Sequence, residues 1–95
     1  EWVEIVLARI NYAGVSMDAS PPDVIRVMEH MAHTGKGIYG MKVLGMGKLT
    51  REEDGTRQAI EFVMGLDCVH AMTIGMTSRQ QVDENLTIMN EYLTI

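Results

Sequence analysis

The sequence predicts an α/β fold of three consecutive βα units with parallel strands, and three observations lead to that prediction. Mostly apolar, strand-like segments are centred near residues 6, 40 and 73, and the first is rich in β-branched residues. They recur at intervals of about 33 to 34 residues, a spacing typical of successive βαβ units. Each segment is followed by a loop and a helix start signal. Strands buried on both faces and joined by amphipathic helices form a parallel sheet through right-handed crossovers.

The hydrophobic pattern assigns each element a range. A serine or threonine followed three positions later by an acidic or amide residue marks each helix start, because such side chains cap free amides. The expected strands, which are mostly apolar, are residues 2–10, 37–44 and 71–76. The expected helices are residues 23–34, residues 51–65 and a third that begins at Ser78. Their buried stripes are predicted to be Val24, Val27, Met28 and Met31, then Ala59, Ile60, Val63 and Met64, then Val82, Leu86, Met89 and Leu93.

Three strands leave two open sheet edges and uncovered apolar surface, so the chain is expected to associate with more sheet. A closed eight-stranded barrel would supply that sheet. We therefore expect residues 1–95 to be a single partial TIM (β/α)8 barrel segment. The first residue is not methionine and lies close to a strand-like run, which agrees with a fragment of a longer barrel domain.

The composition argues against several classes of partner. With 46% hydrophobic residues, 22% charged residues and a net charge of −5, the chain offers little to neutralise a run of phosphates. Nucleic acid and anionic membranes are therefore not expected partners. No apolar run approaches the roughly 18 residues needed to span a bilayer. The single cysteine, Cys68, forms no intramolecular disulfide, which favours a reducing, cytoplasmic location.

The segment after the second strand is the strongest local signal for a binding site. Gly45 and Gly47 are expected to leave bare backbone amides where the strand ends. Lys42 and Lys48 add positive charge, so the segment favours an anion. The start of the third helix is a second anion-binding element on the same face. A tight strand-to-helix turn without a ligand is the alternative.

A Walker-type phosphate loop is not expected in this segment. The positions of its first glycine and of its serine or threonine are occupied by Lys42 and Leu49.

No set of side chains predicts catalysis or a metal site. His30 and His33 are three residues apart on the first helix, but no cysteine or further histidine adjoins them, so a solvated polar face is expected. His70 precedes the third strand, at the end away from the loops, and is interpreted as structural. Cys68 is expected to be buried and inert.

Two segments carry a family resemblance. Residues 37–49 read Gly-Ile-Tyr-Gly-Met-Lys-Val-Leu-Gly-Met-Gly-Lys-Leu, and residues 71–85 read Ala-Met-Thr-Ile-Gly-Met-Thr-Ser-Arg-Gln-Gln-Val-Asp-Glu-Asn. Together they resemble the C-terminal part of an aldo/keto reductase. The resemblance extends from Trp2 nearly to the end of the chain and matches its three strands to the sixth, seventh and eighth of that family's barrel. It implies a nicotinamide-dependent oxidoreductase that transfers a hydride between NADP(H) or NAD(H) and a carbonyl or alcohol.

The resemblance also implies which residues hold the dinucleotide. Met41 stands where many members stack an aromatic ring on the nicotinamide, and residues 42–48 stand where the loop meets the pyrophosphate. Glu84 and Asn85 match a pair that commonly contacts adenine. The residues implied to bind the cofactor are Met41, Lys42, Leu44, Gly45, Gly47, Lys48, Met76, Thr77, Gln81, Glu84 and Asn85.

Two departures limit what the resemblance implies. Gly75, Met76 and Gln81 stand where NADP-preferring members often place a lysine, a serine or threonine, and an arginine, so NADP(H) and NAD(H) both stay open. The family's catalytic aspartate, tyrosine, lysine and histidine belong to the N-terminal half of the barrel, so no catalytic residue is assigned here. The isolated chain is expected to be inactive, and the missing barrel half is an expected partner.

Two other functional classes stay open. One is a non-catalytic α/β module that self-associates through its open strand edges. The other is a different barrel enzyme that binds a phosphorylated substrate at the loops after its last two strands.

Overall fold

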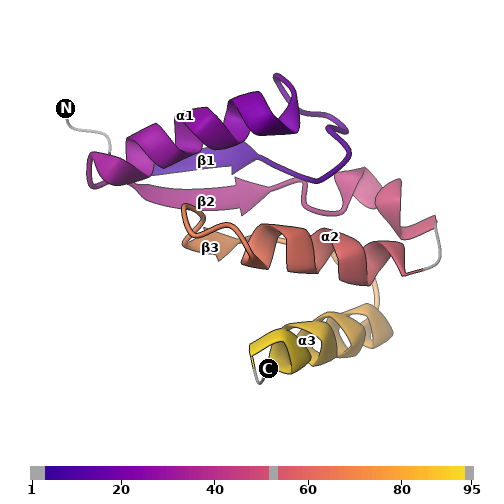
Figure 1. The fold of residues 1–95 in the computed structure, drawn as a ribbon. Coiled ribbons are helices and arrows are strands. Elements are labelled where there is room, and N and C mark those ends of the chain that lie inside the picture. Colours follow the sequence, from indigo (N-terminus) through magenta and orange to yellow (C-terminus); the bar gives the residue numbers. More distant parts are fainter. Residues whose placement is uncertain (1–3, 52–53, 94–95) are drawn as a thin grey trace.

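The computed structural model describes residues 4–51 and 54–93 and has an α/β architecture of three βα units. Its three strands are parallel and form one sheet in the order β1-β2-β3, as predicted (Figure 1). Two short 3-10 turns, η1 and η2, follow β2. The elements are β1 (Ile5–Arg9), α1 (Pro21–His33), β2 (Gly37–Met41), η1 (Gly45–Gly47), η2 (Leu49–Arg51), α2 (Gly55–Met64), β3 (Ala71–Met72) and α3 (Arg79–Leu93).

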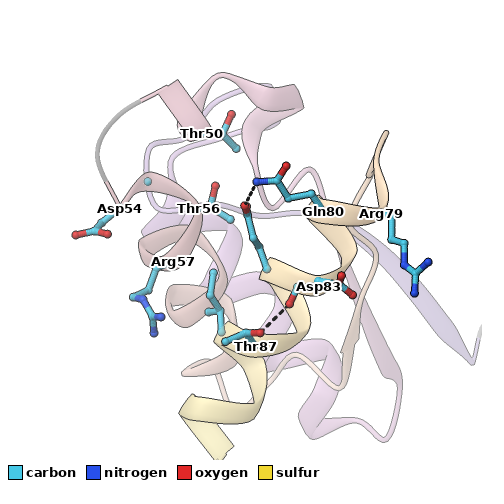
Figure 2. A pocket seen from close by; sticks show the side chains of 11 residues that line it. Thr50, Asp54, Thr56, Arg57, Arg79, Gln80, Asp83 and Thr87 are labelled. Atoms are coloured by element: carbon cyan, nitrogen blue, oxygen red, sulfur yellow. Dashed lines mark hydrogen bonds between the residues drawn. The ribbon is translucent and has the colours of Figure 1, made fainter.

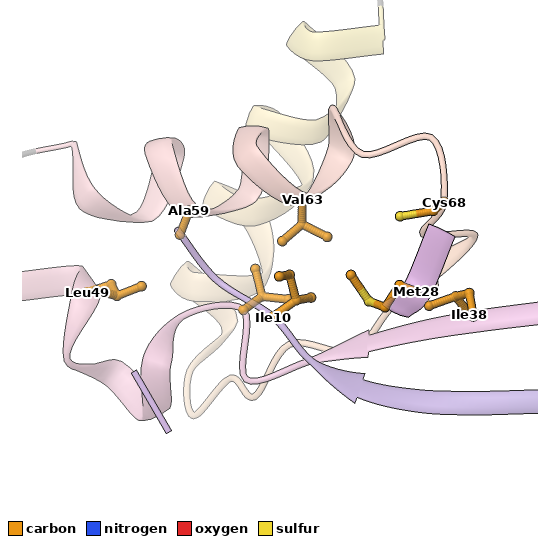
Figure 3. Packing of buried hydrophobic residues seen from close by; sticks show 8 residues of the cluster. Ile10, Met28, Ile38, Leu49, Ala59, Val63 and Cys68 are labelled. Atoms are coloured by element: carbon orange, nitrogen blue, oxygen red, sulfur yellow. The ribbon is translucent and has the colours of Figure 1, made fainter. Parts of the chain in front are cut away.

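Helices α1 and α2 pack on the same face of the sheet. Ile38 of β2 belongs to one buried cluster with Met28 of α1 and Val63 of α2 (Figure 3). Ile10, just after β1, is fully buried in this cluster. Helix α3 lies beyond α2, farther from the strands (Figure 1). The other buried members of the cluster are Val43, Leu49, Ala59 and Cys68.

The opposite face of the sheet is uncovered in the described part of the chain. Ile5 and Leu7 of β1 are 62% and 60% exposed, and Tyr39 of β2, the register partner of Leu7, is 36% exposed. The expectation that the strands are buried on both faces is therefore wrong for this chain. Right-handed crossovers put successive helices on one side of a parallel sheet, and nothing else in the described residues covers the other.

The strands are shorter than the expected residues 2–10, 37–44 and 71–76. Strand β2 ends at Met41 because Lys42 takes a left-handed conformation, with φ of 60°, that turns the chain out of the sheet. Strand β3 has two residues, although Thr73 N–H still donates to Gly40 O at 2.9 Å. Residues 1–3 of the first expected strand lie outside the described residues.

Serine caps start α1 and α3, as the sequence predicts. Ser20 Oγ accepts a hydrogen bond from Asp23 N–H at 3.4 Å, and Ser78 Oγ accepts one from Gln81 N–H at 3.2 Å. Helix α2 begins at Gly55 instead of residue 51. Part of its expected cap, residues 52–53, lies outside the described residues.

The buried stripes of α1 and α2 largely follow the prediction. In α1, Met28 is buried and Val24 and Met31 are half-buried, but Val27 is exposed, so that part of the prediction is wrong. In α2 the buried stripe consists of Ala59, Ile60 and Val63, with Met64 half-buried at its end. None of the described helices combines the length and the apolar character needed to cross a bilayer.

Helix α3 turns a different face inward from the predicted one. Its buried residues are Asn85 and Ile88. Leu86 and Leu93 are 52% and 70% exposed, Val82 is exposed and Met89 is half-buried. The prediction that these four residues form the buried stripe is therefore wrong. The helix contacts α2, and three of the four predicted residues remain exposed beside this contact.

Asn11 is a fully buried polar residue that joins the loop after β1 to the end of β2. Its Nδ2 donates hydrogen bonds to Val15 O at 2.8 Å and to Lys42 O at 3.0 Å. Its Oδ1 accepts from the N–H groups of Ala13 at 3.1 Å and Val15 at 3.0 Å. Both polar atoms of the side chain are thus satisfied by the backbone.

His70 extends the pairing between β2 and the chain before β3. Its N–H donates to Ile38 O at 2.9 Å, and its Nδ1 accepts a hydrogen bond from Ile38 N–H at 2.9 Å. The imidazole takes the place of a strand carbonyl in the ladder, so the structural interpretation of His70 is confirmed.

Replacing Asn11 by Ala is expected to lower the free energy of unfolding by about 3 kcal/mol or more, because buried backbone groups lose their partners. Asn85→Ala is the matched control. Asn85 is also buried, but its Nδ2 has no partner among the described residues, so its loss is expected to be about 1 kcal/mol or less. Urea unfolding followed by circular dichroism measures both values. Equal losses would contradict the role assigned to Asn11.

Candidate functional site

A hollow of about 700 Å³ lies at the carboxyl ends of β2 and β3. Four segments line it: the end of β2 with the glycine loop, the segment after β3, the start of α2 and the first turns of α3. Parallel α/β sheets commonly bind their ligands at this edge.

Eight of the eleven predicted cofactor residues line this hollow. The other three do not: Gly45 is buried next to Leu49 and Val15, and Lys48 and Met76 are exposed. The two motifs, which are separate in the chain, thus meet at one site. The predicted residues that line the hollow form two walls. The β2 wall consists of Met41, Lys42, Leu44 and Gly47, and the α3 wall consists of Thr77, Gln81, Glu84 and Asn85.

The glycine loop does not present the bare amides that the sequence predicts. The N–H groups of Gly45 and Gly47 donate to Lys42 O at 2.9 Å and to Leu44 O at 3.0 Å. Lys48 N–H donates to Gly45 O at 3.2 Å. The expectation of an amide cradle is therefore wrong for this conformation. A run of left-handed residues folds the loop into turns that use these amides internally.

Gly45 is required by packing as well as by conformation. Its φ is 59°, and a Cβ there would lie 3.0 Å from the Leu49 side chain and 3.2 Å from the Val15 side chain. Gly47 is also left-handed, with φ of 86°, but a Cβ there would meet open space. The loop thus packs closely on the segment that follows β1. Asn11 connects the two, because its Nδ2 donates to both Val15 O and Lys42 O.

Asn85 is the one buried side-chain amide of the described residues that has a nitrogen without a hydrogen-bond partner. It is 3% exposed and lines the hollow from the second turn of α3. Leaving such a donor unpaired costs about 1–3 kcal/mol. Native proteins rarely retain that cost without a ligand or water that supplies the acceptor.

Side-chain hydrogen bonds hold the first turns of α3. Gln81 Oε1 accepts from Thr77 N–H at 2.7 Å, and Gln80 Nε2 donates to Glu84 Oε1 at 3.0 Å. A neutral amide and a carboxylate are therefore fixed on the α3 wall of the hollow. The cation Lys42 lies on the β2 wall.

A second hollow, of about 710 Å³, adjoins the first between the starts of α2 and α3 (Figure 2). Thr50, Thr56 and Glu84 line both hollows. Together the two hollows form a trough that runs from the end of β2 across the start of α2 to α3.

Two arginines border the second hollow. Arg57 is bound to Glu91 at 2.7 Å and to Glu61 at 3.3 Å, and these hydrogen bonds raise its pKa above the ordinary value. Arg79, the first residue of α3, also lines this hollow (Figure 2). The Arg57 guanidinium is therefore held by two carboxylates, and Arg79 is a second cation at this hollow.

Three threonines that line the site, Thr50, Thr56 and Thr73, are not among the residues predicted from the sequence. Thr56 falls inside the helix expected over residues 51–65, whereas the actual helix starts at Gly55. Glycine is a poor residue for a helix interior, which is the signal that could have found this start. Thr73 falls inside the expected third strand, which ends one residue earlier.

The remaining candidates lie outside the site. His30 and His33 are exposed on α1, as expected. Cys68 is buried, and burial, with a smaller effect of Glu29, raises the pKa of its thiol, in keeping with an inert residue. Among the residues that the structure describes, no three histidine, cysteine or acidic side chains are grouped to hold a metal ion.

Comparison of the chain with models of known families, with curated proteins and with solved structures gives no match. The family resemblance therefore rests on the two motifs alone.

Gly45→Ala is expected to lower the free energy of unfolding by about 2 to 3 kcal/mol, since the new Cβ is strained and also crowds Leu49 and Val15. Gly47→Ala carries the same conformational penalty without the crowding, so about 1 kcal/mol is expected. Denaturant midpoints at a constant m-value separate the two effects. A Gly47→Ala loss as large as that of Gly45→Ala would show that packing is not the cause.

Proposed function

We propose that this chain is the cofactor-binding C-terminal segment of an aldo/keto reductase-like oxidoreductase, which uses NAD(H) or NADP(H) and a carbonyl or alcohol substrate. Its three βα units are the last three of a (β/α)8 barrel. The observation that carries the proposal is Asn85, a buried amide that lacks an acceptor in a hollow lined by both motifs of the resemblance.

The walls of the hollow suit the parts of a dinucleotide. Lys42 supplies positive charge on the β2 wall. This charge attracts the negatively charged pyrophosphate of a dinucleotide. On the α3 wall, Asn85 offers a donor and Glu84 an acceptor, which match the acceptor ring nitrogens and donor amino group of adenine. The glycine amides are not part of this support, because the loop already uses those of Gly45 and Gly47.

The chain binds and orients the cofactor but supplies no proton donor in this proposal. The tetrad that the resemblance implies belongs to the other half of the barrel. The uncovered sheet face with Ile5, Leu7 and Tyr39 then faces the barrel interior, where side chains from the missing strands bury it.

Asn85→Leu is expected to weaken NAD(H) or NADP(H) binding by about tenfold, because a ligand acceptor loses its buried donor. Stability should change little, since no protein hydrogen bond is lost. Asn90→Leu, an exposed position on the same helix outside both hollows, is the matched control and should bind as the parent chain does. Isothermal titration calorimetry measures both affinities, and the absence of saturable binding to the parent chain would refute the proposal.

A second candidate function is self-association as a non-catalytic module, and the uncovered sheet face favours it. Ile5 and Leu7 are largely exposed on β1, the strand at one open edge of the sheet. An exposed apolar face beside an unpaired strand edge is a typical site for pairing with another chain.

Leu7→Lys is expected to convert an associated form to monomers, because it places a charge on the apolar sheet face. Val27→Lys is the matched control, since Val27 is similarly exposed (57%) but lies on α1. Sedimentation velocity at several protein concentrations measures the distribution of species. A parent chain that is monomeric throughout, or equal effects of the two variants, would exclude this candidate.

A further inference from the structure

His70 binds β2 through both its backbone and its ring. Its N–H donates to Ile38 O at 2.9 Å, and its Nδ1 accepts a hydrogen bond from Ile38 N–H at 2.9 Å. A neutral imidazole has one nitrogen that accepts and one that donates, so this bond places the ring proton on Nε2. The contact with Ile38 therefore depends on the charge of the ring.

The donor in this contact is buried, whereas the acceptor can reach solvent. Ile38 is 1% exposed, so water does not replace the acceptor of its N–H. His70 is exposed, so a proton can reach its ring. An imidazolium carries a proton on both nitrogens and accepts no hydrogen bond. Protonation thus leaves Ile38 N–H without an acceptor in the buried part of the sheet.

Strand β3 is paired with β2 over a short length. The two strands share two residue pairs, against five between β1 and β2. Beyond these pairs, Thr73 N–H donates to Gly40 O at 2.9 Å. Loss of the bond to Ile38 N–H therefore weakens the pairing of β2 with β3 and leaves the longer pairing of β1 with β2 in place.

From this geometry we propose that His70 is a pH-sensitive switch in the sheet: protonation of its ring removes the acceptor of Ile38 N–H and releases β3 from β2. Thr73, Ile74 and Gly75 follow β3 directly and line the first hollow, so the switch also displaces this part of the lining. The unfolded chain takes up the same proton without losing a hydrogen bond. It therefore binds more protons than the folded chain, and the folded state is favoured as pH rises.

The groups around His70 are mostly of types that change charge at other pH values. Carboxyl, thiol, phenol and ammonium groups ordinarily do so outside the range of about pH 5 to 8, whereas an imidazole does so within it. The described titratable side chains on the elements around His70 are Asp67 and Cys68 of its own segment, Lys36 and Tyr39 of the β2 segment, Glu4 before β1, and Glu29 and His33 of α1.

Hydrogen exchange of the full chain, followed by NMR at about pH 7.5 and about pH 5, tests the proposal. The protection factor of Ile38 N–H, referred to the intrinsic exchange rate at each pH, is expected to fall by about tenfold at the lower pH. Gly37 N–H, which donates to Glu4 O at 2.8 Å, is the control amide and should keep its protection. Equal protection of Ile38 at both pH values, or an equal fall at Gly37, would overturn the proposal. The nitrogen chemical shifts of the ring give a second readout, and a neutral ring protonated on Nδ1 would also overturn it.

Two variants assign the effect to His70. His70→Asn keeps an acceptor, because its Oδ1 lies as many bonds from the backbone as Nδ1 does, but the amide takes up no proton in this range. Its Ile38 protection should be the same at both pH values. His33→Asn removes an exposed imidazole of α1 and should keep the fall of the parent chain. A fall in His70→Asn as large as that of the parent, or its disappearance in His33→Asn, would overturn the assignment.

Discussion

The side chain of Asn11 is the interaction on which the arrangement of the loops depends. It binds the backbone of its own loop through Ala13 and Val15 and reaches across to Lys42 O, where β2 ends. A buried amide with all its hydrogen bonds made specifies one arrangement of the groups around it, because every alternative leaves a polar atom unpaired. Lys42, where the chain turns out of the sheet, and Val15, on which Gly45 packs, are both bound by this side chain.

Asn11 and Asn85 show two uses of the same side chain. Both are buried, but the first is fully bonded within the chain and the second has a nitrogen without a partner. The first therefore contributes to stability. The second has a buried donor that a ligand or water in the hollow can satisfy, and proteins retain such groups at sites of function. The contrast gives the candidate site a physical basis that is independent of any family motif.

The α/β class, the parallel strand order and two of the helix caps could be predicted from the sequence, because spacing and capping residues act locally. The buried face of α3 could not. Val82, Leu86 and Leu93 recur at the helical period but are exposed, whereas Asn85 and Ile88 are buried. The helical period alone does not determine which side of a helix contacts the rest of the fold.

The hydrogen bonds within the glycine loop also could not be predicted from the sequence. Gly45 and Gly47 allow left-handed turns, but their spacing is the same whether the amides point outward or bond within the loop. The meeting of the two motifs at one hollow was better predicted, because parallel strands end at the same edge of a sheet.

The one-sided cover of the sheet has a thermodynamic consequence. Ile5, Leu7 and Tyr39 are already in contact with water in the folded chain, so unfolding exposes less new apolar surface than a fully covered sheet of this size would. The heat capacity change of unfolding scales with that newly exposed surface. The stability curve of the isolated chain should therefore be flatter and its thermal transition broader than its length implies. Burial of this face against further sheet would make the stability curve more strongly curved and the thermal transition narrower.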